Sequence, residues 1–128
     1  MDRKKLTKVL AYLISIIFFI QLVATKLAWY SLIWWFDMPV HFLGGLWLGL
    51  LFIYIFGGAG NRYKYIFRII SLVFLCGIGW EFFEFYFVNH LADNPFNLLD
   101  TISDLCFDLA GGCFAILYFF RRIMLQLS

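Results

Sequence analysis

The fold is decided by the stretch Asp100-Thr101-Ile102-Ser103-Asp104-Leu105-Cys106-Phe107-Asp108-Leu109-Ala110-Gly111-Gly112. It places carboxylates at Asp100, Asp104 and Asp108, each four residues after the last, at the head of an otherwise apolar segment. On an α-helix these side chains lie on nearly one face, about one turn apart. Acidic side chains are costly inside a bilayer, so such a face usually marks an ion path, a ligand site or a relay. We therefore expect the other segments to cover this acidic face.

Composition places the chain among membrane proteins. Of its 128 residues 64% are hydrophobic, 17 are Phe, and the mean hydropathy is +0.88. A soluble domain of this size could not bury so much apolar surface. We predict an integral membrane protein with a single membrane domain over residues 1–128. The three cysteines lie in apolar segments without a Cys-x-x-Cys pair, which favours packing roles over a disulfide framework.

Four apolar segments are each close to the roughly 20 residues that a membrane-spanning helix needs. They are separated by loop signals at Gly57-Gly58-Ala59-Gly60-Asn61 and Asp93-Asn94-Pro95. The first segment follows a basic head, as in a signal peptide, but no small-residue cleavage site follows it, so we interpret it as a retained helix. The predicted fold is all-α, a polytopic four-transmembrane-helix bundle with helices at residues 9–30, 37–56, 65–88 and 100–120.

The basic residues predict the orientation of the bundle. With alternating crossings, nine of the ten Lys and Arg residues fall on one side and only Lys26 on the other. The positive-inside rule then places both termini in the cytoplasm. Topology accounts for these residues, so nothing in the sequence indicates nucleic-acid binding.

The acidic residues show the opposite asymmetry, because all except Asp2 fall in the outer half or outer loop. At about 1.5 Å per residue, His41, Glu84 and Asp104 reach a similar depth on three helices. A charged residue costs about 2.5–3.5 kcal/mol at a helix centre, so five or six facing lipid would cost on the order of 10 kcal/mol. They must face the bundle interior and share protons, bind a cation or be hydrated from outside.

The predicted site therefore lies in an outer pocket. We expect His41, Glu84 and Asp104 to carry any catalysis. Asp100 is expected at the mouth and Asp108 at the floor, where it could be protonated. His41 could be a ligand or a general base, or equally a packing residue bonded to one carboxylate. The candidate ligands of a divalent metal ion are Asp37, His41, Glu81, Glu84, Asp100, Asp104 and Asp108.

Glycines inside the second, third and fourth spans predict close helix packing. Gly45 and Gly49 have the small-xxx-small spacing at which membrane helices approach closely. This spacing favours packing within the bundle, and it leaves open a homo-oligomer formed through glycine-rich helix faces. The first span carries neither acid nor glycine in its apolar run, so we expect it to serve in packing.

Three of these segments resemble the small bacterial membrane proteins of the VanZ-like and YjdF-like type. The resemblance rests on Asp37-Met38-Pro39-Val40-His41-Phe42, on Trp80-Glu81-Phe82-Phe83-Glu84 and on Asp100-Thr101-Ile102-Ser103-Asp104 followed by Gly111-Gly112. It is closer to the YjdF-like pattern, because Glu84 stands where VanZ-like members often carry Gln. Met38 replaces a Lys common in the family, which removes a cation from the site. The resemblance implies the bacterial cytoplasmic (inner) membrane and a role in the cell envelope, with VanZ-like members tied to glycopeptide resistance.

Two functional hypotheses follow. In the first, the protein binds a lipid or lipid-linked envelope substrate at the outer leaflet, or acts on it as a metal-dependent membrane hydrolase or transferase. In the second it is a non-enzymatic module for envelope stress, antibiotic resistance or ion handling, with a proton-sharing carboxyl network. A purely structural polar core is a third interpretation. A complete channel is disfavoured, because the cytoplasmic half of the spans carries almost no polar residues.

Overall fold

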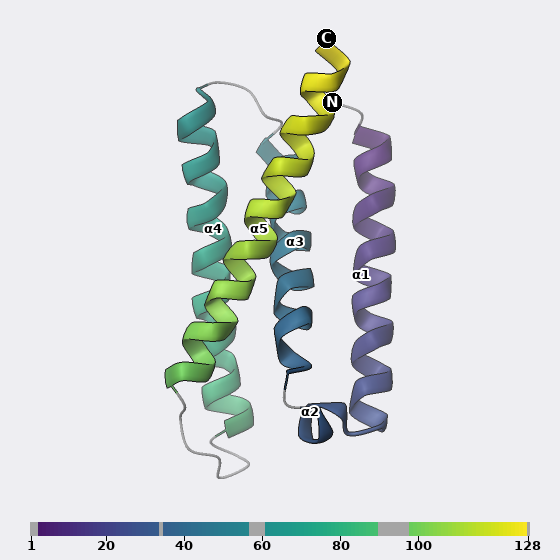
Figure 1. The fold of residues 1–128 in the computed structure, drawn as a ribbon, viewed down its shortest axis with the longest axis vertical. Helices are drawn as coiled ribbons and strands as arrows, with labels where there is room; N and C mark the ends of the chain where they lie inside the picture. The colour runs from purple at the N-terminus through teal and green to yellow at the C-terminus, as the bar shows by residue number, and fades with distance from the viewer. Residues whose placement is uncertain (1–2, 34, 57–60, 90–97, 128) are drawn as a thin grey trace.

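The computed structural model is built from helices (Figure 1). It describes residues 3–33, 35–56, 61–89 and 98–127. The elements are α1 (Arg3–Lys26), α2 (Trp29–Leu32), α3 (Asp37–Phe56), α4 (Arg62–Phe83), the π-helical segment η1 (Glu84–Asn89) and α5 (Leu98–Leu127). No strand occurs among these residues. Four of the helices are long and apolar enough to cross a membrane, which confirms the predicted fold class.

The helix boundaries differ from the predicted ones for local reasons. α1 begins at Arg3 because the basic head continues the helix, and it ends before Ala28, whose φ of 54° is left-handed. α4 begins at Arg62, because the Asn61 side chain accepts hydrogen bonds from the Tyr63 and Lys64 backbone N–H groups. α5 runs past the Arg121-Arg122 pair to Leu127. The predicted loop residues 57–60 and 93–95 lie outside the described residues.

The long helices alternate in direction, so α1 begins and α5 ends at the same end of the bundle (Figure 1). This agrees with the expectation that both termini lie on one side of the membrane. That this side is the cytoplasm stays a prediction. The start of α3, the end of α4 and the start of α5 lie together at the opposite end (Figure 1).

α3 and α5 make the most extensive helix contact in the described chain. They approach closely at Gly45 and Gly111: a Cβ atom on Gly45 would overlap the Asp108 carbonyl, and one on Gly111 would overlap the Phe42 carbonyl. One turn further along α3, a Cβ on Gly49 would come 2.8 Å from the Ala115 Cβ. The small-xxx-small pair of α3 is therefore used inside the chain.

The half of the bundle that contains the start of α1 and the end of α5 has an apolar core. Its buried residues carry no charged side chain; they are Leu6, Leu10, Leu50, Ile53, Tyr65, Ile69, Val73, Ala115, Ile116 and Phe119. α1 packs on α3, where the Trp47 indole Nε1 donates a hydrogen bond to the Leu10 carbonyl over 3.0 Å. This agrees with the expected packing role of the first span.

Outside this core, the helices present large apolar side chains to their surroundings. Phe18, Phe19, Phe67 and Leu117 are each more than 60% exposed, and they belong to three different spans. Soluble monomeric proteins rarely expose so much apolar surface to water. These faces contact membrane lipids. The three cysteines, on α4 and α5, are also exposed and free. They lie on the surface of the bundle and not, as expected, in its packed interior.

The glycine crossing gives a matched test of the packing. Gly45→Ala should lower the free energy of unfolding by about 1–3 kcal/mol, because the added methyl group meets the α5 backbone. Gly44→Ala is the control, since nothing lies within 4 Å of a Cβ there. Unfolding of both variants in detergent micelles is followed by circular dichroism. Equal stability of the two variants would contradict the close crossing.

Candidate functional site

The structure brings all seven predicted site residues together at one end of the bundle. We call them the polar cluster. Asp37 and His41 come from α3, Glu81 from α4 and Glu84 from the start of η1. α5 contributes three carboxylates from successive turns. The cluster consists of Asp37, His41, Glu81, Glu84, Asp100, Asp104 and Asp108.

His41 lies at the centre of the cluster, with 6% of its surface exposed. Its Nδ1 lies 3.0 Å from Asp108 Oδ1, with which it forms a hydrogen bond. Its Nε2 lies 3.4 Å from Asp37 Oδ1 and 3.5 Å from Asp104 Oδ2. The contact with Asp37 follows from the four-residue spacing on α3. The contacts with Asp104 and Asp108 depend on how α3 and α5 cross.

Asp108 reaches His41 because two glycines leave room for it. Gly45 lets the α5 backbone at Asp108 lie directly against α3. On the other side, a Cβ on Gly77 of α4 would come within 2.8 Å of Asp108 Oδ2. Asp108 is predicted as a metal ligand at the floor, but here its carboxylate holds His41 Nδ1 and belongs to neither ligand group described next.

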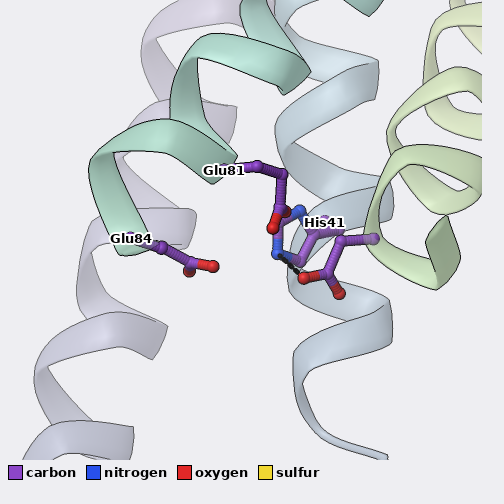
Figure 2. A group of neighbouring side chains, drawn as sticks. His41, Glu81 and Glu84 are labelled. Atoms are coloured by element: carbon purple, nitrogen blue, oxygen red, sulfur yellow. Dashed lines mark ion pairs between the residues drawn. The ribbon is translucent and has the colours of Figure 1, made fainter. Parts of the chain in front are cut away.

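Two groups of side chains in the polar cluster have the geometry of a metal site. The inner group consists of His41, Glu81, Glu84 and Asp104, and the outer group of Asp37, Asp100 and Asp104. Within each group, one ligand atom from every member lies within 4.8 Å of the others. Figure 2 shows Glu81 and Glu84 projecting from neighbouring turns toward His41. Asp104 is the member that the two groups share.

Two oxygen atoms of the inner group are buried and have no hydrogen-bond partner among the described residues, namely Asp104 Oδ2 and Glu81 Oε1. Asp104 is only 1% exposed. A buried polar atom without a partner typically costs about 1–3 kcal/mol, and more when the group is charged. Both atoms therefore lie where a proton or a cation would stabilise them.

Glu84 has a partner that the sequence analysis missed. The Trp80 indole Nε1 donates a hydrogen bond to Glu84 Oε1 over 3.0 Å, and the Trp80 ring stacks on Phe83. The four-residue spacing of Trp80 and Glu84 was a signal that could have identified this pair. Glu84 also stands where the helix changes from α to π geometry, a rare feature that is frequent at functional sites.

A family model described as a predicted membrane protein (DUF2238) matches residues 1–124. The chain belongs to this family. None of the curated proteins and none of the solved structures compared with the chain matches it. Membership of the DUF2238 family supports the predicted class of membrane protein. The narrower resemblance to VanZ-like and YjdF-like proteins stays a prediction.

The polar cluster needs positive charge from outside the chain's own basic residues. It combines six carboxylates with one imidazole. α3 carries no Lys or Arg, and neither does α4 after Arg68 or α5 before Arg121. Protons or a bound cation must therefore offset the carboxylates. Imidazole nitrogen together with carboxylate oxygen is a donor set that suits Zn²⁺, Fe²⁺ or Mn²⁺.

The contact between Trp80 and Glu84 can be tested by NMR. Glu84→Ala should shift the Trp80 indole N–H resonance upfield, because that group loses its carboxylate acceptor. Glu84→Gln keeps an acceptor oxygen and should shift it less. The Trp47 indole, bonded to the Leu10 carbonyl, is the internal control and should not move. An unchanged Trp80 resonance in Glu84→Ala would rule out the bond.

Proposed function

We propose that the polar cluster binds a divalent cation and that the protein acts on, or binds, a lipid or lipid-linked envelope substrate. The proposal rests chiefly on one observation. Four ligand side chains from three membrane spans converge in the inner group, and two of their buried oxygen atoms lack a hydrogen-bond partner among the described residues. A bound cation would satisfy both atoms and supply the missing positive charge.

The surroundings of His41 Nε2 support a cation at this point. When a neutral ring donates from Nδ1 to Asp108, its lone pair lies on Nε2, facing two carboxylates. That arrangement is repulsive unless a proton or a cation lies between them. With metal–ligand bonds of about 2.0–2.2 Å, ligand atoms of a tetrahedral site lie about 3.4 Å apart. The distance from Nε2 to Asp104 Oδ2, 3.5 Å, matches this separation.

The contact with Asp108 also fits a metal-binding histidine. Such residues usually donate their second ring N–H to a carboxylate or a carbonyl, which fixes the ring and increases its basicity as a ligand. With His41 as a ligand through Nε2, it is Glu81 or Glu84 that could accept a proton from substrate or water. A bound divalent cation would polarise a phosphoryl or acyl oxygen or activate a water molecule.

The position of the polar cluster favours a lipid substrate. At the end of the bundle two members of the cluster reach the surface, because Asp100 is exposed and the Asp37 side chain is 26% exposed. The neighbouring surface is strongly apolar, because Phe82, Tyr86 and Leu99 are each more than 65% exposed. A lipid could therefore place its tail along these side chains and its headgroup at the carboxylates. The predicted orientation assigns this end to the outer leaflet.

The first candidate function is catalysis, as a metal-dependent hydrolase or transferase. The second candidate function is that of a non-enzymatic module that serves envelope stress, antibiotic resistance or ion handling. The contacts of His41 with three carboxylates favour this second candidate, because shared protons could hold the cluster together without a metal. Conduction through the bundle is disfavoured by the apolar core between the cluster and the opposite end.

Metal content tests whether the polar cluster binds a divalent cation. Protein purified in detergent should contain stoichiometric divalent metal by elemental analysis, and Asp104→Asn should lose most of it. Asp108→Asn should bind metal about tenfold more weakly, because His41 loses its orienting carboxylate. Asp2→Asn makes the same chemical change in the basic head of the sequence and should have no effect. The proposal would be overturned by a purified protein that contains no metal, folds normally and keeps its stability when a chelator is added.

Lipid analysis distinguishes the enzyme from the binding module. Cells that express the wild-type chain are compared with cells that express Glu84→Gln at the same level, by mass spectrometry of extracted and co-purified lipids. An enzyme should change the abundance of at least one envelope lipid, and the variant should not. A binding module should co-purify with a lipid whose cellular abundance stays unchanged. If the variant loses its fold together with this effect, the carboxyl network is structural.

A further inference from the structure

We propose that the polar cluster holds two divalent cations side by side, bridged by the carboxylate of Asp104. This inference rests on the proposed function, in which the cluster binds at least one cation. It adds a second site, a bridging residue and a difference in chemistry between the two sites.

The geometry of the two ligand groups carries the proposal. The inner group gathers four ligand atoms and the outer group three, and each set lies within 4.8 Å. Apart from Asp104 the two groups have no member in common. A carboxylate has two oxygen atoms and can bind a separate cation with each. Asp104 is therefore the side chain through which two cations could share a ligand.

The burial of Asp104 points to a ligand independently of the clustering of acids. Its side chain is 99% buried, and its Oδ2 has no hydrogen-bond partner in the described part of the chain. That oxygen faces His41 Nε2, which belongs to the inner group. Asp100 lies one turn earlier on α5, toward the exposed end, and it belongs to the outer group.

The charge of the polar cluster favours a pair of cations over one. If all six carboxylates are ionised, one divalent cation offsets two of their six negative charges and a pair offsets four. No Lys or Arg occurs in the parts of α3, α4 and α5 that form the cluster. Repulsion between carboxylates is strong away from bulk water, so the first cation does not saturate the cluster.

The two sites differ in their donor atoms. The inner group contains the imidazole nitrogen of His41, which favours Zn²⁺, Fe²⁺ or Mn²⁺, whereas the outer group offers oxygen atoms alone, which suit Mg²⁺, Ca²⁺ or Mn²⁺. Mn²⁺ suits both donor sets. It is also paramagnetic, so two Mn²⁺ ions that share a carboxylate give a spin-coupled signal that separate ions do not.

The experiment titrates Mn²⁺ into the full chain, stripped of metal by a chelator and held in lipid nanodiscs. Wild-type protein should bind two Mn²⁺ per chain and give a spin-coupled signal in electron paramagnetic resonance. Asp100→Asn should bind one and lose the coupling, because the outer group loses a ligand and the inner group keeps all four. Asp37→Asn should do the same, and it replaces Asp100→Asn if that variant fails to fold. Asp2→Asn is the control and should bind two.

The outcomes separate this inference from the proposed function. If the wild type binds one Mn²⁺ and Asp100→Asn also binds one, the second site is wrong and the proposed function stands. If two ions bind without spin coupling, the Asp104 bridge is wrong. If folded wild-type protein binds none, both proposals are overturned.

Discussion

The hydrogen bond between His41 on α3 and Asp108 on α5 is the contact on which the arrangement of the cluster depends. It exists because Gly45 and Gly77 leave no side chain where the Asp108 backbone and carboxylate lie. Once Asp108 is held there, the preceding turn of α5 brings the Asp104 carboxylate to Nε2 of the His41 ring and close to the carboxylates of Glu81 and Glu84. Removing one partner of such a buried hydrogen bond is destabilising, because the polar group left behind is out of reach of water.

Much of this architecture follows from local properties of the sequence. The four spans depend on hydropathy and length, and the shared depth of His41, Glu84 and Asp104 depends on the fixed rise of a helix. The cost of carboxylates in lipid then requires them to face inward. These arguments need no knowledge of which helices touch, and the helix pattern and the convergence of the seven side chains could be predicted from them.

What could not be predicted depends on how the helices cross. Depth along the helix predicts Asp100 at the mouth and Asp108 at the floor, but not that Asp108 contacts His41 Nδ1 or that Asp104 joins two groups. Their roles differ because α5 runs obliquely across α3 and α4, so that each turn meets different neighbours (Figure 1). The π-helical turn that begins at Glu84 also departs from regular helix geometry, and no spacing of residues in the sequence predicts it.

The apolar half of the bundle has an electrical consequence. His41 lies four residues into α3, about 6 Å from its start, which is about a fifth of a 30 Å hydrocarbon layer. A divalent cation that reached this depth from the open end would cross only that fraction of the transmembrane voltage, worth about 1 kcal/mol per 100 mV. Its occupancy would follow the composition of one compartment and respond only weakly to the energised state of the membrane.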